Sequence, residues 1–192
     1  MTMHATASDA ALISLVAAGD ESAFRALYQR HQGPVYRFAL MMSGRANIAD
    51  DVTQEVFLFF LQRADRFDAG KGALASFLIG VARNCVRRRR EVERVTSPLD
   101  ESVPARNDPF ADCARREEID RVRAAILELP IHYREAVVLC ELQEMSYADA
   151  AAALDCAVGT INSRLHRARA ILTRKLRRVA SATALTVMGC LR

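Results

Sequence analysis

Tryptophan is absent from this chain of 192 residues, and glycine and proline are scarce, with 8 and 5 residues. A composition with few residues that break helices and many alanines, leucines and arginines favours helix throughout. The five cysteines are scattered with no Cys-x-x-Cys pair, and the four histidines are isolated from one another. This spacing fits a reducing compartment and predicts no metal site.

Long apolar runs and targeting signals are also missing. The apolar stretch 179–191 is too short to span a bilayer, and the first eight residues lack a basic stretch followed by an apolar core. We therefore expect a cytoplasmic protein without membrane insertion. The adjacent acids Asp50–Asp51 and Glu117–Glu118 diverge along a helix, so they form no general acid–base pair. The sequence predicts no enzyme activity, no small-molecule substrate and no cofactor.

Charge is unevenly distributed along the chain. Residues 83–94 carry six arginines against two glutamates, whereas residues 98–120 carry seven acids against three arginines. A second basic zone, 158–178, holds seven arginines and lysines and no acid. Two basic zones separated by an acidic one indicate a polyanion that is held at two places.

Residues 146–172 have the pattern of two helices that meet at a tight turn. Ser146 is a good N-cap for a first helix that ends at Leu154, and a second helix begins at Val158. The expected inward face of the second helix consists of Val158, Ile161, Leu165, Ala168 and Leu172. This is the pattern of a helix-turn-helix, whose second helix enters a major groove, and equally of an αα-hairpin with a solvated cationic face. The lack of acids favours nucleic acid.

Five helices are predicted in the N-terminal half. The first begins at Ser8 and stops at Gly19, and the second begins at Asp20. Pro34 suits the first turn of a third helix, which ends at Gly44. The fifth follows a loop at 69–73 and carries four consecutive arginines, 87–90. Four adjacent cations repel one another, so we expect them to face phosphates and not only solvent.

The fourth helix, capped by Asn47 and extending to Phe67, is apolar around most of its circumference at 57–61. Such a helix is buried on several sides, by its own domain or by a partner as well. A separate polar edge is formed by Asp51, Gln54 and Glu55. A central core helix with a solvated acidic edge explains the same pattern.

Residues 95–112 hold three prolines and mixed charge, so they are expected to form a linker. Two further helices are predicted over 113–129 and 131–143. Their expected inward faces are Ile119, Val122, Ala125, Ile126 and Leu129 in the first, and Val137, Val138 and Leu142 in the second.

Two blocks of sequence resemble a known family. DDVTQEVFLFFLQRADRFD followed by SFLIGVARN is similar to the core-binding and promoter-melting domain of bacterial RNA polymerase sigma factors. LPIHYREAVVLCELQEMSYADAAAALDCAVGTINSRLHRARAIL is similar to their C-terminal promoter-binding domain. The order of the blocks, over about residues 9–178, resembles the extracytoplasmic-function subgroup. The resemblance implies an all-α fold of two small helical domains: a region-two-like domain at 8–94, a flexible linker at 95–112, a region-four-like domain at 113–179 and a tail at 180–192.

The resemblance also implies three sets of binding residues. Contact with the β′ clamp helices of core polymerase is expected from Asp51, Gln54, Glu55 and Phe57. Contact with the minus-ten element is expected from Asn84, on an unpaired base, and from Arg83, Arg87 and Arg88, on phosphates. Contact with the minus-thirty-five duplex is expected from Thr160, Asn162, Ser163, Arg164, His166 and Arg167.

The predicted function is that of a sigma factor, which binds core RNA polymerase and directs it to specific promoters. Its expected partners are core polymerase, through the β′ clamp helices and the β flap, promoter DNA and an anti-sigma factor. One alternative, an operator-binding regulator, leaves the DxxQEVF helix and the run 87–90 unexplained. The other alternative is a sigma-like decoy that sequesters an anti-sigma factor. A decoy needs no phosphate contacts, so the basic helices of this chain argue against it.

Overall fold

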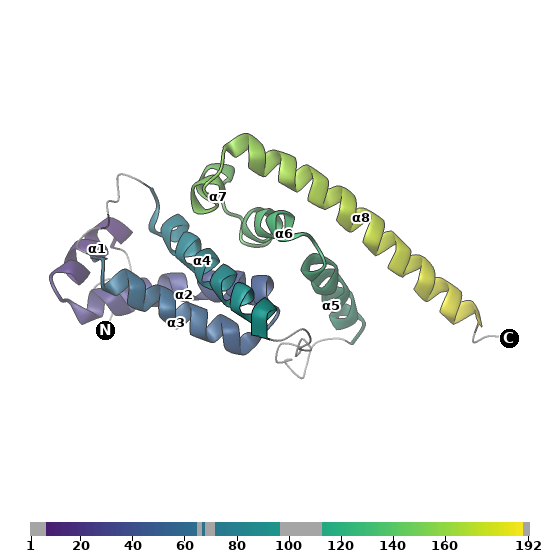
Figure 1. Cartoon of the computed structure of the whole chain (residues 1–192), viewed down its shortest axis with the longest axis horizontal. Coiled ribbons are helices and arrows are strands. Elements are labelled where there is room, and N and C mark those ends of the chain that lie inside the picture. The colour runs from purple at the N-terminus through teal and green to yellow at the C-terminus, as the bar shows by residue number, and fades with distance from the viewer. Residues whose placement is uncertain (1–6, 65–66, 68–71, 97–112, 190–192) are drawn as a thin grey trace.

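The computed structural model describes residues 7–64, 67, 72–96 and 113–189, and these residues form helices and connections without a strand. The helices are α1 Asp9–Ala17, α2 Glu21–Ser43, α3 Ala46–Leu61, α4 Leu74–Thr96, α5 Cys113–Leu127, α6 Ile131–Val137, η3 Val138–Leu142, α7 Tyr147–Ala153 and α8 Val158–Gly189. They lie in two groups, α1–α4 and α5–α8 (Figure 1). The predicted all-α fold is confirmed, whereas most of the expected linker, 97–112, lies outside the described residues.

Three helix starts follow local cap chemistry, as predicted. Ser8 Oγ accepts from Ala11 N before α1, Asp20 Oδ1 accepts from two backbone amides before α2, and Ser146 Oγ accepts from Asp149 N before α7. Each oxygen satisfies amides that have no partner inside the first turn.

The predicted cap of α3 was wrong. Its N-cap is Arg45, without a side-chain cap bond, and Asn47 lies inside the helix. Gly44 ends α2 in the left-handed region at φ 74°, and α3 begins after the single connecting residue Arg45. Ser43 Oγ steadies this turn by accepting from Arg45 N at 3.2 Å.

The predicted break at Pro34 was also wrong, because α2 continues through it as one helix. The buried side of α2 runs across the proline without interruption, as Leu27, His31, Val35, Phe38 and Met42. Tertiary packing of this face outweighs the hydrogen bond that a proline removes from the helix interior. The preceding residue, Gly33, has no Cβ to clash with the proline ring, which lowers the cost.

The core lies mainly between α2, α3 and α4 and extends without interruption into the second group. Four side chains that were expected to be inward are instead exposed: Ile119, Val122, Leu142 and Val158. The two in α5 lie N-terminal to Ala125 and Ile126, through which this helix enters the core. Periodicity identified the correct helices, but neighbouring elements cover only part of each apolar face.

The two groups meet where α4 lies along α7, as Figure 1 shows. A Cβ atom added at Gly80 of α4 would lie 3.4 Å from the carbonyl oxygen of Ala153 in α7. The absence of a side chain at Gly80 therefore permits this close approach. At the other end of the second group, the backbone of α8 continues to Gly189, so the last helix includes most of the apolar stretch 179–191.

We predict that Gly44→Ala lowers the free energy of unfolding by about 1 kcal/mol, because an alanine is strained at φ 74°. Urea unfolding followed by circular dichroism measures the change. Gly159→Ala in α8 is the control, since a Cβ there meets nothing within 4 Å. A Gly44→Ala variant as stable as the parent would contradict the argument from backbone strain.

Candidate functional site

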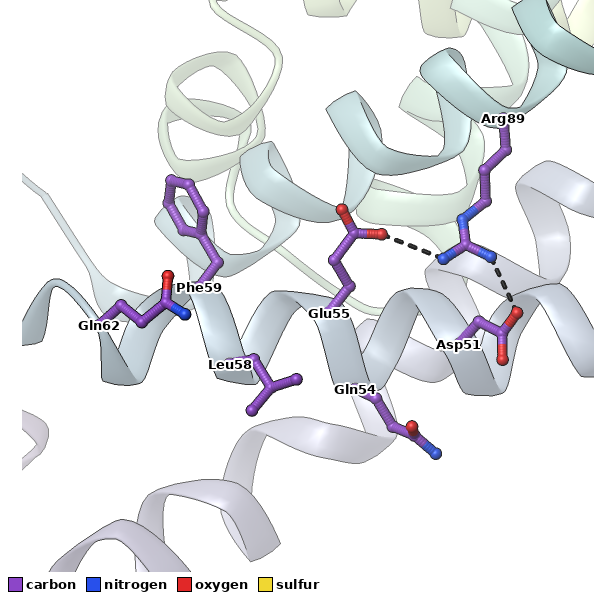
Figure 2. Close-up of a pocket in the computed structure, with 7 residues that line it drawn as sticks. All are labelled: Asp51, Gln54, Glu55, Leu58, Phe59, Gln62 and Arg89. Carbon is purple, nitrogen blue, oxygen red and sulfur yellow. Dashed lines mark hydrogen bonds and ion pairs between the residues drawn. The ribbon is translucent and has the colours of Figure 1, made fainter.

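The outer face of α3 carries an open groove (Figure 2). It is lined by Asp51, Gln54, Glu55, Leu58, Phe59 and Gln62 of α3 and by Arg89 of α4. Asp51, Gln54 and Leu58 recur at helical spacing, so they share one exposed side of α3. The groove thus combines a polar edge with apolar surface, which suits a partner of mixed character.

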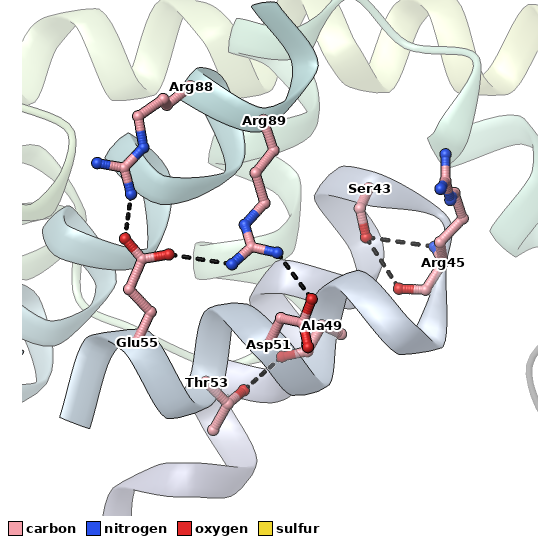
Figure 3. Close-up of polar contacts among 8 residues, drawn as sticks. All are labelled: Ser43, Arg45, Ala49, Asp51, Thr53, Glu55, Arg88 and Arg89. Atoms are coloured by element: carbon pink, nitrogen blue, oxygen red, sulfur yellow. Dashed lines mark hydrogen bonds and ion pairs between the residues drawn. The ribbon is translucent and has the colours of Figure 1, made fainter. Parts of the chain in front are cut away.

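Two arginines of α4 hold the acidic edge of α3. Arg89 donates through Nη1 to Asp51 Oδ2 at 2.9 Å and through Nη2 to Glu55 Oε2 at 3.0 Å. Arg88 Nη2 donates to the other oxygen of Glu55, so both of its oxygens accept from arginines (Figure 3). Burial alone would raise the pKa of Glu55, but the bonds from Arg89 and Arg88 outweigh it, and the pKa lies below its usual value.

Two neighbouring apolar residues of α3 have opposite environments. Phe57, which the resemblance implied as a polymerase contact, is 2% exposed and packs edge-on against Tyr28, with ring centroids 4.7 Å apart. In this structure it therefore supports α3 from inside. Leu58 is 60% exposed and lies in the groove lining. Its exposure could not be read from the sequence, because the whole run 57–61 is apolar.

The residues of α4 that were predicted to meet the minus-ten element divide into two environments. Asn84 and Arg87 are exposed, and the side chain of Arg88 is 65% exposed in spite of its bond to Glu55. Arg83 instead faces the second group. Its Nε donates to Glu135 Oε1 at 2.7 Å, and its Nη1 donates to the carbonyl oxygen of Leu154 at 3.2 Å. The structure therefore brings three of the four to the surface and holds the fourth at the junction.

A second arginine also joins the two groups. Arg134 of α6 is buried and donates to the carbonyl oxygens of Met42, Leu127 and Leu129. These carbonyls lie at the C-terminal ends of α2 and α5, where a cation is favourable. Burial, assisted by the charge of Arg90, lowers the pKa of Arg134 to about 10, so the side chain stays charged at neutral pH. Because the contact with Met42 joins residues 92 positions apart, helical periodicity gave no signal for it.

The predicted DNA-contacting residues of α8 gather on one side of the helix. Asn162, Ser163, His166 and Arg167 are exposed and line an open hollow. The opposite side, formed by Ile161, Leu165 and Ala168, is buried in the core. The remaining two, Thr160 and Arg164, are half-buried, and Arg164 reaches back to Cys156 Sγ at 3.9 Å.

The turn before α8 has the geometry of a tight helix-turn-helix connection. Asp155 adopts φ 49°, in the left-handed region that aspartate tolerates better than most residues. The turn therefore forms without a glycine. It sets α7 against α8 and leaves the hollow of α8 facing outward.

Arg89 has no assigned role in the sequence pattern, although a signal for its position exists. It follows the buried Cys85 of α4 by four residues, so both lie on the side of the helix that faces α3. The dense arginine run hid this difference between Arg89 and its neighbours.

Neither a metal site nor a membrane span accompanies these sites in the described part of the chain. Among the residues that the structure describes, no group of three or more His, Cys, Asp or Glu side chains is placed to hold a metal. Over the same residues, no helix has the length and apolar character needed to cross a bilayer.

Comparison with known proteins decides the family. Residues 27–94 match the model of Sigma-70 region 2, and residues 119–172 match that of Sigma-70 region 4. The ECF RNA polymerase sigma factor SigM of Mycobacterium tuberculosis is 37% identical over 173 residues, which cover 88% of this chain and 85% of that protein. The chain belongs to the extracytoplasmic-function (ECF) family of sigma factors. A further ECF sigma factor, EcfG of Rhodopseudomonas palustris, is 39% identical over 141 residues, which cover 71% of this chain and 75% of that protein.

Two solved structures share the fold of this chain. CnrH, in complex with the cytosolic domain of CnrY, matches with a TM-score of 0.70 and 27% identity, over 88% of this chain and 97% of CnrH. The sigma factor RpoE of Bartonella quintana, in complex with the anti-sigma factor NepR, matches with a TM-score of 0.67 and 29% identity, over 80% of this chain and 96% of RpoE. The predicted function, a sigma factor that directs transcription initiation, is confirmed over the two alternatives. The contacts of single residues stay predictions.

We predict that Glu135→Ala lowers the free energy of unfolding by about 2–3 kcal/mol, because it leaves the Arg83 guanidinium without its carboxylate at a buried junction. Thermal and urea unfolding measure the loss. Glu141→Ala, which breaks an exposed pair with Arg169, is the control and should leave the midpoint unchanged. Equal effects of the two substitutions would show that the junction adds nothing to stability.

Proposed function

We propose that this sigma factor binds core RNA polymerase through the outer face of α3. The observation that supports this best is the groove itself. It presents Asp51 and Gln54 beside Leu58, on a helix that the buried ring of Phe57 holds in place. An exposed leucine beside directed hydrogen-bond acceptors suits the centre and rim of a protein interface. The proposed occupant is the pair of β′ clamp helices, and the β flap is the proposed partner of the second group of helices.

The exposed side of α4 is proposed to hold the minus-ten strand. Asn84 offers an amide, which can read the edge of an unpaired base, and Arg87 and Arg88 offer cations for phosphates. Arg83 belongs to the same site in this proposal. Its Nε and Nη1 donate to Glu135 and Leu154 of the second group, so a phosphate can take these two donors only when the two groups of helices separate.

The hollow of α8 is proposed to meet the minus-thirty-five duplex. Asn162, His166 and Arg167 project from the first turns of a helix whose opposite face is buried, which is the geometry of a recognition helix in the major groove. Ser163 and the half-buried Thr160 and Arg164 are proposed to contact the backbone. The expected side-chain contacts with bases are arginine with guanine and asparagine with adenine.

An anti-sigma factor is the proposed regulatory partner. CnrH and RpoE, whose folds this chain shares, were both solved in complexes, with the cytosolic domain of CnrY and with NepR respectively. We further propose that the chain acts in the cytoplasm, with the polymerase, and catalyses no reaction itself. The division into a region-two-like domain at 8–94, a linker at 95–112, a region-four-like domain at 113–179 and a tail belongs to the same proposal.

Run-off transcription with purified core polymerase and a promoter library tests the function. We predict transcripts from defined start sites with the parent protein and none with the double variant Asp51→Arg, Gln54→Ala. This variant places a cation on the groove, so it should lose copurification with core polymerase and keep the circular dichroism spectrum of the parent. Copurification at the parent level would remove α3 as the docking surface, and a lack of defined transcripts from the parent would contradict the function.

We predict that Arg167→Ala weakens promoter binding by the holoenzyme by about 1–3 kcal/mol, if the guanidinium reads a base. Competition between promoter and random DNA measures it. The loss should be largest for promoters with the preferred minus-thirty-five sequence. An equal loss on all DNA sequences would assign Arg167 to phosphate alone. Arg25→Ala, an exposed arginine of α2 outside these surfaces, is the control.

A further inference from the structure

We propose that Arg89 is a positioning residue for polymerase binding, which fixes the carboxylate of Asp51 so that its free oxygen faces the docking partner. This inference rests on the proposed function of the α3 groove. It assigns a role to an arginine of α4 that the resemblance to sigma factors left without one, and it separates the roles of two acids, Asp51 and Glu55, that the sequence grouped together.

The two acids differ in how far the chain itself satisfies them. Both oxygens of Glu55 accept from arginines of α4, and its side chain is 34% exposed. Asp51 accepts through Oδ2 alone, and its side chain is 62% exposed. Within the described residues no partner is recorded for Asp51 Oδ1, and Figure 2 shows this oxygen directed away from Arg89. Glu55 therefore fastens α3 to α4, whereas Asp51 is the acid that remains to be offered to a partner.

One guanidinium bridges the two acids, and this geometry requires an arginine. Asp51 and Glu55 are four residues apart on α3, so their side chains lie one turn apart on the same face. Arg89 spans them with its two terminal nitrogens, one on each carboxylate. A planar fork can serve two acceptors in fixed directions, while a lysine ammonium acts as a point charge on a flexible stem.

The bridge also removes the net charge of the edge. Two carboxylates of α3 are matched by the guanidinium groups of Arg88 and Arg89, so the groove attracts a partner weakly at long range. What it offers is a fixed acceptor beside exposed leucine. Because Arg89 orders the Asp51 side chain before binding, its conformational entropy is not lost on binding. This saving corresponds to about three- to tenfold in affinity.

The test measures the Kd of the full chain for core polymerase. We expect Arg89→Met to weaken binding about three- to tenfold and Arg89→Lys to restore part of the loss. Asp51→Asn should weaken binding of the parent, and Arg89→Met should have little further effect in the Asp51→Asn background, because Arg89 acts through Asp51. Such non-additivity is a readout that a general loss of stability would not produce. Arg25→Met removes an exposed arginine elsewhere on the first group and should leave the Kd unchanged.

Two results would overturn the proposal. One is an unchanged Kd for Arg89→Met, and the other is full additivity of Arg89→Met and Asp51→Asn. If the Asp51→Arg, Gln54→Ala variant still copurifies with core polymerase, the docking surface itself is wrong and both proposals fall. If that variant is lost from the polymerase while Arg89→Met binds like the parent, only the positioning role is excluded.

Discussion

Each guanidinium N–H of α4 that donates to an acceptor within the protein is not available to a phosphate, and the organisation of this molecule depends on that constraint. α4 packs against α3 on one side and α7 on another, and its arginines reach acids of α3, Glu135 of α6 and the carbonyl oxygen of Leu154 at the end of α7. Arg83 is used for the contact with the second group of helices, and Arg88 and Arg89 for the contact with α3. The cations that a polyanion would need are thus also the side chains that hold the free protein together.

The acceptors differ in how firmly they hold these cations. The Glu135 side chain is 3% exposed, so its pair with Arg83 is shielded from water and from salt. The bond between Arg88 and Glu55 lies at the surface, where ion pairs contribute little. A phosphate therefore competes easily for Arg88, whereas it replaces Glu135 at Arg83 only when α4 separates from the second group of helices. The sites on α4 are graded in accessibility along a single helix.

Local chemistry could be predicted from the sequence, and long-range packing could not. The caps at Ser8, Asp20 and Ser146 depend on neighbouring residues alone, and the structure has them where they were expected, with the cap at Asn47 as the exception. The continuation of α2 through Pro34 depends on a buried face shared with other helices. The same reason explains why periodicity placed Ile119, Val122, Leu142 and Val158 inside, since it shows which residues share a face but not what covers it.

The candidate sites follow the same division. On α8 the spacing of residues within one helix was enough to predict which side chains share the exposed face, and four of the six expected residues line one hollow. On α3 and α4 the pairing of Asp51 and Glu55 with Arg89 joins residues more than thirty positions apart. No pattern within either helix specifies such a partner, although helical spacing from Cys85 directs Arg89 toward α3.

The length of α8 has a mechanical consequence. Its 32 residues form one unbroken helix, and at 1.5 Å per residue it is about 48 Å long. Helices of this kind curve only gently, so the rod transmits rotation from one end to the other. A tilt of about 10° at its first turns would displace the opposite end by about 8 Å over that length. A change in the angle of the first turns of α8 therefore moves its distal end, and a displacement of the distal end changes that angle.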